Sequence, residues 1–83
     1  MHNIIFRNPA IKFLKKLDKN IQRKIISKID SLKDIPRIGK PLTGNLKGLW
    51  RLRYDQFRII YKINDTELKI YVLDIGNRDN IYK

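Results

Sequence analysis

Residues 49–61 decide the fold, and they read Leu49-Trp50-Arg51-Leu52-Arg53-Tyr54-Asp55-Gln56-Phe57-Arg58-Ile59-Ile60-Tyr61. Trp50, Leu52 and Tyr54 alternate with Arg51 and Arg53, which predicts a strand before Asp55-Gln56. If Asp55-Gln56 is a two-residue turn, a second strand follows from Phe57. In this hairpin Tyr54 pairs with Phe57, so Arg53 lies directly across from Arg58. Like charges opposed across a ladder are destabilising. The arginine pair therefore indicates a site for an anionic ligand rather than a contribution to folding.

A strand and two helices are predicted before the hairpin. Ile4 to Arg7 is a short strand candidate, and Asn8-Pro9 is expected to begin a helix with Asn8 as its N-cap. Asp18 is expected to cap a second helix. Both helices carry one apolar stripe at helical spacing, formed by Ala10, Phe13, Leu14 and Leu17 in the first and by Ile21, Ile25, Ile29 and Leu32 in the second. Two helices joined this closely form an antiparallel hairpin that must bury its stripes against another layer.

The rest of the chain predicts a loop and three strands. Proline and glycine punctuate residues 35–48, which indicates a long loop. Strands are expected at about 49–54, 57–63 and 68–75, with Gly76 ending the last strand before a short tail. The predicted fold class is α+β. An N-terminal strand and a two-helix hairpin pack on one face of a mainly antiparallel sheet, in one domain over residues 1–83.

The predicted register of the second hairpin separates two faces of the sheet. If Ile63 pairs with Leu68, then Arg58 faces Leu73, Ile60 faces Tyr71 and Lys62 faces Lys69. One face is then an apolar bed for the helices, made of Leu52, Ile59, Tyr61, Ile63, Leu68, Ile70 and Val72. The other face is a basic groove floored by a few apolar side chains, made of Arg51, Arg53, Arg58, Ile60, Lys62, Lys69, Tyr71 and Leu73.

The net charge of +11 points to a nucleic acid or an acidic protein as the partner. Residues 1–47 carry twelve Lys or Arg against three Asp, and residues 48–83 carry seven against five acidic residues. The first half of the chain therefore supplies most of the long-range positive electrostatic potential. Basic residues on the predicted helices, such as Lys15, Lys19 and Arg23, are individually typical of a solvated face, but together they steer anions.

Composition also limits the chemistry. The chain has no cysteine, a single histidine (His2), and seven Asp and one Glu that are scattered along the sequence. Disulfides and thiolate chemistry are excluded, and a metal site is not expected. No apolar run approaches the length of a membrane span or a signal-peptide core. We therefore expect a soluble cytoplasmic protein that needs no metal or cofactor and has no membrane partner.

Three runs of sequence resemble, in order, the RelE branch of the RelE/ParE toxin superfamily. They are Leu46-Lys47-Gly48-Leu49-Trp50-Arg51-Leu52-Arg53, then Phe57-Arg58-Ile59-Ile60-Tyr61, then Val72-Leu73-Asp74-Ile75-Gly76-Asn77-Arg78-Asp79-Asn80-Ile81-Tyr82. The leading strand, the two amphipathic helices, the length and the basic charge agree with this resemblance, which covers nearly the whole chain. The ordered combination carries more weight than any one run.

The resemblance implies a ribosome-dependent mRNA endonuclease, the toxin of a type II toxin–antitoxin pair. Such toxins cut mRNA in the ribosomal A site: the ribose 2′-hydroxyl attacks the adjacent phosphate and leaves a 2′,3′-cyclic phosphate and a 5′-hydroxyl. This chemistry needs no metal or cofactor, but it needs positive charge around a pentacoordinate phosphate. The implied partners are the ribosome, mRNA and a cognate antitoxin. A cationic surface suits an antitoxin that is acidic and partly disordered when free.

Four residues are candidates for the catalytic site. Arg58 matches the family's arginine after the hairpin turn, Arg78 matches its arginine near the C-terminus, and Tyr82 matches the tyrosine that follows. Arg53 joins them because it faces Arg58. On spacing alone, Arg78 also reads as a surface arginine and Tyr82 as a frayed terminal aromatic. Candidate contacts to RNA or the ribosome are Arg51, Lys62, Lys69, Lys15, Lys19, Arg23 and Lys47.

The chain departs from the family where a base is expected. Arg51 and Arg53 stand where the RelE branch typically has two lysines, and Asn77 stands where many relatives have a histidine. An arginine stays charged in proteins and cannot accept a proton. Tyr82 or a group of the ribosome would have to act as the base. Two alternatives stay open: a ParE-like toxin that inhibits DNA gyrase, and an RNA-binding or interaction module without catalysis.

Overall fold

The computed structural model describes residues 1–77. Within this range it contains two α-helices, five strands and three short 3-10 helices. In chain order these are β1 (Asn3–Phe6), α1 (Asn8–Lys15), α2 (Lys19–Asp30), η1 (Ser31–Lys33), η2 (Pro36–Ile38), β2 (Lys40–Pro41), η3 (Gly44–Leu46), β3 (Trp50–Tyr54), β4 (Phe57–Asn64) and β5 (Lys69–Asn77).

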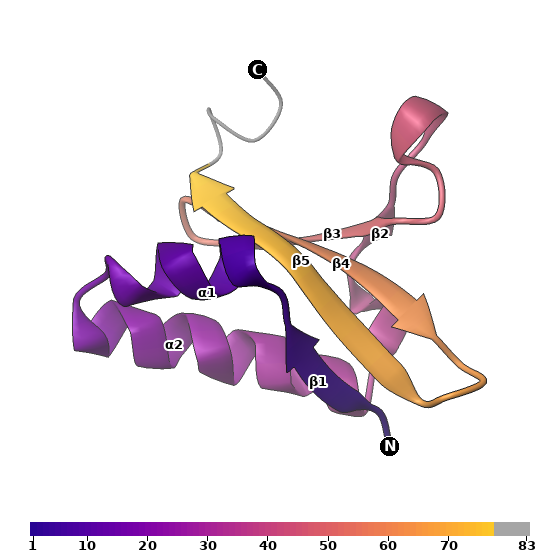
Figure 1. The fold of residues 1–83 in the computed structure, drawn as a ribbon, viewed down its shortest axis with the longest axis horizontal. Helices are drawn as coiled ribbons and strands as arrows, with labels where there is room; N and C mark the ends of the chain where they lie inside the picture. The colour runs from indigo at the N-terminus through magenta and orange to yellow at the C-terminus, as the bar shows by residue number, and fades with distance from the viewer. Residues whose placement is uncertain (78–83) are drawn as a thin grey trace.

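The strands form one sheet in the order β1-β5-β4-β3-β2. β1 runs parallel to β5, and the other neighbouring strands are antiparallel. Both helices lie on one side of this sheet (Figure 1). The fold class predicted from the sequence is therefore confirmed.

The core lies between the helices and the sheet. The helices contribute Ala10, Leu14, Ile25, Ile29 and Leu32, and the sheet contributes Leu52, Phe57, Ile59, Tyr61, Ile70, Val72 and Ile75. Phe13 packs edge-on against Phe57, with ring centroids 5.9 Å apart. The helical spacing of the apolar stripes and the alternation along β3 and β4 put these side chains on the facing surfaces.

One helix start agrees with the sequence and the other does not. Asp18 caps α2 as predicted, because its Oδ1 accepts a hydrogen bond of 2.7 Å from the Asn20 N–H. Asn8 is already the first helical residue of α1, and Arg7 is the N-cap. The predicted Asn8 cap is wrong because the Arg7 N–H still bonds the Val72 carbonyl at 2.9 Å. The chain therefore passes directly from the sheet into the helix.

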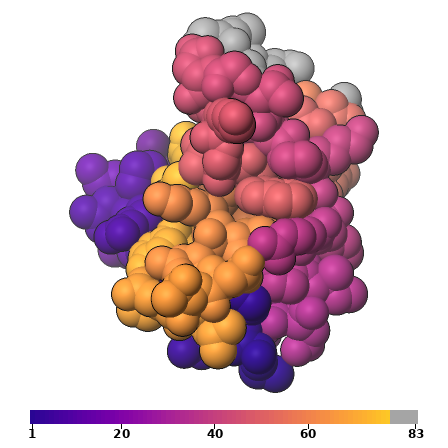
Figure 2. All heavy atoms as spheres, turned by 90° about the vertical axis from the view of Figure 1, so that its right-hand side faces the viewer, coloured from indigo at the N-terminus to yellow at the C-terminus, as the bar shows by residue number. Residues whose placement is uncertain are grey.

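The predicted loop at residues 35–48 contains short ordered pieces. The Tyr61 hydroxyl, buried in the core, donates a hydrogen bond of 2.7 Å to the Pro36 carbonyl and accepts one of 3.2 Å from the Gly39 N–H. These bonds fix η2 and the start of β2 against the sheet. The segment between β2 and β3, which includes η3, instead stands out from the body of the molecule (Figures 1 and 2).

The buried Tyr61 hydroxyl predicts a loss of stability at alkaline pH. Burial raises the pKa of this hydroxyl above its ordinary value of about 10, although the Gly39 hydrogen bond and the Arg37 charge oppose that shift. The folded pKa is the higher one, so this stabilisation is complete below about pH 10 and is lost as the pH rises towards the folded pKa. Urea unfolding at pH 8 and pH 11 measures it. We expect Tyr61→Phe to lose less stability over this range than the wild type, and an equal loss would contradict the assignment.

The second hairpin has a different register from the predicted one. Its turn is longer, because Leu68 lies in the turn at a φ of +56° and is 47% exposed instead of pairing with Ile63. The Asn64 side chain closes this turn by accepting a hydrogen bond of 2.9 Å from the Glu67 N–H. The strand then begins at Lys69, and Ile63 pairs with Ile70.

A β-bulge shifts the register again further along β5. Tyr61 pairs with Val72, but the adjacent Ile60 pairs with Asp74, so Leu73 is the extra residue. The bulge turns Ile75 into the core, where it is 2% exposed. The predicted pairs Arg58–Leu73, Ile60–Tyr71 and Lys62–Lys69 are wrong, and the observed pairs are Arg58–Gly76, Ile60–Asp74 and Lys62–Tyr71. β5 also continues through Gly76 to Asn77 instead of ending before it.

Candidate functional site

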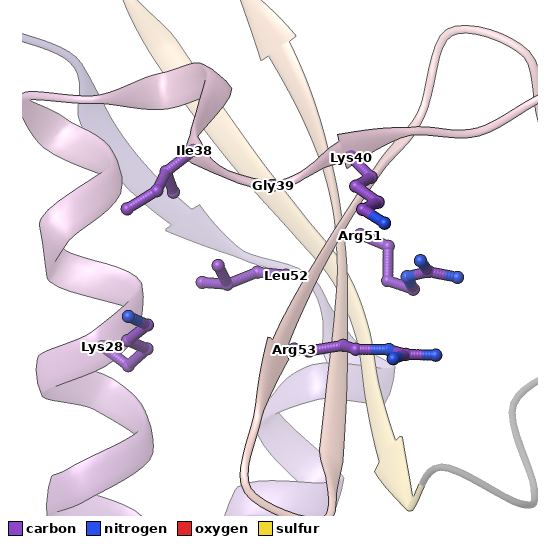
Figure 3. A pocket seen from close by; sticks show the side chains of 7 residues that line it. All are labelled: Lys28, Ile38, Gly39, Lys40, Arg51, Leu52 and Arg53. Carbon is purple, nitrogen blue, oxygen red and sulfur yellow. The ribbon is translucent and has the colours of Figure 1, made fainter.

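Three arginines lie on the face of the sheet that the helices leave uncovered. Arg51 and Arg53 project to the same side of β3, and Leu52 projects the other way, towards α2 (Figure 3). Arg58 of β4 is the direct cross-strand partner of Arg53, as the two-residue turn predicted. We call this surface the open face. The opposed arginine pair, one residue pair away from the β3–β4 turn, is therefore part of the observed register.

The register places two rows of cross-strand neighbours on the open face. The first row runs from Arg53 to Arg58 and on to Gly76, and the second runs from Arg51 to Ile60 and on to Asp74. Gly76 is buried and has no side chain, so β5 adds no side chain to the row of Arg53 and Arg58. Ile60 is 7% exposed and forms the floor between the charged residues. The result is a shallow basic surface with an apolar floor and a carboxylate at one side.

The Arg51 guanidinium has capacity to bind a ligand. Its Nε is buried, and no described residue accepts a hydrogen bond from it. Leaving a buried donor of a charged group unsatisfied costs free energy, so an acceptor supplied by a ligand would be favoured at this atom. An arginine fork also matches the oxygens of a phosphate group.

A notch continues the basic surface around the edge of β3. It has a volume of about 300 Å³ and is bounded by α2, β3 and the end of β2 (Figure 3). Its lining is Lys28, Ile38, Gly39, Lys40, Arg51, Leu52 and Arg53. Four of these seven residues are basic, so positive charge extends from the open face to the helix layer.

The structure brings together only some of the predicted site residues. Lys62 is exposed on the open face opposite Tyr71. Lys69 lies near the end of the same face, where its Nζ is 4.0 Å from the Glu67 Oε1. The remaining predicted contacts are exposed elsewhere: Lys15 on α1, Lys19 and Arg23 on α2, and Lys47 at the end of η3. Arg78 and Tyr82 lie outside the described residues.

The single histidine of the chain takes part in a different cluster. His2 Nε2 lies 3.0 Å from Asp65 Oδ1, and Arg37 Nη2 lies 2.7 Å from Asp65 Oδ2. The hydrogen bond from Arg37, with a smaller one from His2, holds the pKa of the Asp65 carboxyl below its usual range. This cluster ties the N-terminus to η2 and to the β4–β5 turn, so His2 serves that junction rather than the open face.

Two residues of the open face were missed by the sequence analysis. Asp74 and Gly76 reach this face only because Leu73 is bulged. A signal was present in Val72-Leu73-Asp74-Ile75, where two adjacent apolar residues interrupt the period of two. The interruption shows that the phase changes, but it does not show which residue is the extra one.

The described residues offer neither a metal cluster nor a membrane-spanning helix. In residues 1–77 no group of three or more His, Cys, Asp or Glu side chains is placed to hold a metal ion. No helix in that range is both long and apolar enough to cross a membrane.

Comparison with known proteins decides the family. The family described as the ParE toxin of the type II toxin–antitoxin system parDE matches residues 4–82. A putative RelE-like toxin protein of Escherichia coli is 32% identical over 80 residues, which are 94% of this chain and 84% of that protein. The chain belongs to the RelE/ParE toxin superfamily. It is a RelE-like toxin of a type II toxin–antitoxin system.

Solved structures of RelE toxins have the same fold. The toxin–antitoxin complex RelBE2 of Mycobacterium tuberculosis contains a chain with a TM-score of 0.84 and 28% identity, covering 93% of this toxin and 98% of that chain. The archaeal RelE–RelB complex of Pyrococcus horikoshii contains a chain with a TM-score of 0.76 and 26% identity. The match covers 95% of this toxin and 97% of that chain. The first was solved as a toxin–antitoxin complex and the second as a complex of RelE with RelB.

Proposed function

We propose that this toxin cleaves mRNA in the ribosomal A site. The observation that carries the proposal is the cross-strand pair Arg53–Arg58, with Arg51 one row away, on the face of the sheet opposite α1 and α2. Opposed like charges do not assist folding, but they stabilise an anion placed between them. A phosphate that gains negative charge in a transition state is the ligand for which such a pair is best suited.

The reaction is an internal transfer of a phosphodiester. The 2′-oxygen forms a bond to phosphorus, the bond from phosphorus to the 5′-oxygen breaks, and the products are a 2′,3′-cyclic phosphate and a 5′-hydroxyl. We assign Arg53 and Arg58 to the stabilisation of the pentacoordinate phosphate, since fixed charges act most strongly where charge develops. By the family resemblance, Arg78 and Tyr82 complete the catalytic set.

We further propose that two groups of basic residues contact the ribosome and its RNA. Arg51, Lys62 and Lys69 extend the open face from the arginine pair in the direction away from the β3–β4 turn. Lys15, Lys19, Arg23 and Lys47 are too widely spread to join the chemistry, but their charge attracts the phosphate backbone over a longer range. Because the proposed activity needs translating ribosomes, we expect the toxin to act in the cytoplasm.

Programmed ribosomes test the proposal. Purified toxin is added to ribosomes stalled with a defined codon in the A site, and to the same mRNA without ribosomes. We expect cleavage within the A-site codon only when the ribosome is present. Equal cleavage of free mRNA would overturn the dependence on ribosomes, and no cleavage of either sample would overturn the nuclease assignment.

Inhibition of DNA gyrase is the second candidate function. It is favoured by the match of residues 4–82 to the ParE toxin family. A gyrase inhibitor acts through protein contacts and has no need for the arginine pair. A supercoiling assay with the same preparation separates the two functions, because the nuclease proposal predicts full gyrase activity in the presence of the toxin. A loss of supercoiling without RNA cleavage would favour the ParE-like function, and neither effect would favour a non-catalytic RNA-binding module.

An acidic, partly disordered antitoxin is the proposed protein partner. The net charge of +11 and the exposed basic residues of the open face suit such a chain. We expect the Kd of the coexpressed antitoxin to rise at least about tenfold between about 0.1 M and 1 M salt, because the Debye length falls from about 10 Å to about 3 Å. Titration calorimetry at the two salt concentrations measures this. A Kd that does not change with salt would show that apolar contacts dominate the interface.

A further inference from the structure

We propose that Asp74 is the proton acceptor of this site and takes the proton of the attacking 2′-hydroxyl; this rests on the proposed RNA cleavage. The reaction needs a base at that hydroxyl. Arg51, Arg53 and Arg58 cannot supply one, because a guanidinium stays protonated. The single histidine, His2, is bonded to Asp65 in the cluster at the N-terminus.

The β-bulge places Asp74 beside the arginines. In a regular ladder Asp74 would follow the phase of Val72, which is buried in the core. The extra residue Leu73 reverses that phase, so Asp74 shares the open face with its cross-strand partner Ile60. Bulges next to active sites commonly serve to redirect one side chain.

The register of β4 and β5 sets the distance between Asp74 and Arg58. Asp74 stands two residues from Gly76 on β5, and Gly76 is opposite Arg58. A diagonal neighbour of this kind lies about 7–8 Å away between Cα atoms. A phosphate held by Arg58 therefore has its adjacent ribose within reach of the Asp74 carboxylate.

The carboxylate is both oriented and accessible. Its Oδ1 accepts a hydrogen bond of 2.9 Å from the Ile75 N–H, and the residue is exposed. The backbone thereby holds one oxygen, and the exposed carboxylate remains accessible to a ligand. The charged and titratable groups that share this face come from the neighbouring strands, the β4–β5 turn and the β1–α1 junction. They are Arg51, Arg53, Arg58, Lys62, Lys69, Tyr71, Glu67, which accepts a hydrogen bond of 3.3 Å from the Tyr71 hydroxyl, and Arg7, whose guanidinium lies 4.8 Å from the centre of the Tyr71 ring.

The proposed step balances in atoms and charge. The proton of the 2′-hydroxyl moves to Asp74 while the 2′-oxygen forms its bond to phosphorus. The bond between phosphorus and the 5′-oxygen breaks, and water protonates the departing oxygen. Asp74 then returns its proton to solvent. The arginines stabilise the charge on the phosphate, and Asp74 accepts the proton, so the two roles belong to different residues.

Single-turnover cleavage of mRNA on programmed ribosomes tests the role of Asp74. We expect Asp74→Asn to slow the cleavage step about 100- to 10,000-fold, the usual contribution of general base catalysis. The matched control is Asp55→Asn, which removes the same charge from the exposed turn at the end of the β3–β4 hairpin. Asparagine also tolerates the positive φ of +55° there. We expect this control to cleave within about threefold of the wild-type rate.

The pH profile and ribosome affinity separate a proton acceptor from a structural residue. In the wild type the rate should be nearly flat over the neutral range, because the carboxylate takes the proton. In Asp74→Asn hydroxide must take it, so the rate should rise about tenfold per pH unit. Ribosome affinity and melting temperature should stay at wild-type values. An Asp74→Asn rate equal to wild type, or an equal loss in Asp55→Asn, would overturn the proposal.

The experiment also distinguishes this inference from the proposed function. If the wild-type toxin cuts on the ribosome and Asp74→Asn cuts equally well, only the role of Asp74 fails. If the wild-type toxin does not cut at all, the nuclease function fails first. A low Asp74→Asn rate with the steep pH profile supports both.

Discussion

Arg58→Leu should lower single-turnover cleavage on the ribosome by about 100- to 1000-fold, which is the usual contribution of one positioned charge at a transition state. Arg58 stands in one row between Arg53 on β3 and Gly76 on β5. The leucine side chain replaces the aliphatic part of the arginine side chain in β4, but it lacks the guanidinium. We expect the free energy of unfolding to change by less than about 1 kcal/mol, because the substitution also removes a like-charge cross-strand pair.

The measurement pairs a melting temperature with the cleavage rate for each variant. The control is Lys24→Leu, which removes one charge from the exposed surface of α2 in the helix layer. That variant should melt and cleave like the wild type, apart from a small effect of net charge. An Arg58→Leu protein that cleaves normally would remove Arg58 from the mechanism. One that melts far below the wild type would show that Arg58 is mainly structural.

Gly39→Ala should cause the largest loss of stability among the single substitutions considered for this toxin, about 1–3 kcal/mol. A Cβ at this position would collide with the Arg51 carbonyl oxygen and lie 2.7 Å from the Tyr61 hydroxyl oxygen. One of these atoms belongs to the backbone of β3 and the other to a buried side chain, so neither can move easily. Relief requires η2 and β2 to shift away from β3, which also opens the notch beside Arg51 and Arg53.

Urea unfolding measures the effect of Gly39→Ala. The control is Thr43→Ala in the same segment, where the side chain is exposed and makes no capping hydrogen bond. We expect the control to stay within about 0.5 kcal/mol of the wild type. If Gly39→Ala unfolds at the wild-type urea concentration, the segment from η2 to β2 does not pack on the sheet as described.

The first hairpin was predictable because its turn leaves no choice of register. Two residues between Tyr54 and Phe57 allow one pairing, and that pairing fixes Arg53 opposite Arg58. The helices were predictable for a similar reason, since their apolar stripes have a single period and must face the sheet. The arginines of the open face could therefore be named from the sequence alone.

The second hairpin was not predictable to the residue. Its turn closes through the Asn64 side chain and holds Leu68 at a positive φ, a conformation that an apolar residue rarely adopts. The bulge at Leu73 then changes the phase a second time. Both features depend on packing across the sheet rather than on local preference, so Asp74 was not among the residues predicted for the open face. The predicted roles of Arg78 and Tyr82 remain predictions.

A single change in the RNA tests whether the ribose 2′-hydroxyl attacks a phosphate held at the open face. The mRNA on programmed ribosomes carries a 2′-deoxy nucleotide on the 5′ side of the scissile phosphate, and the matched substrate carries the natural ribose there. With the natural ribose, we predict a new 3′ end bearing a 2′,3′-cyclic phosphate and a new 5′-hydroxyl in the A-site codon. With the 2′-deoxy nucleotide, we predict no cleavage. Continued cutting of the 2′-deoxy substrate, or a 5′-phosphate on the product, would contradict attack by the 2′-hydroxyl on a phosphate held at the open face.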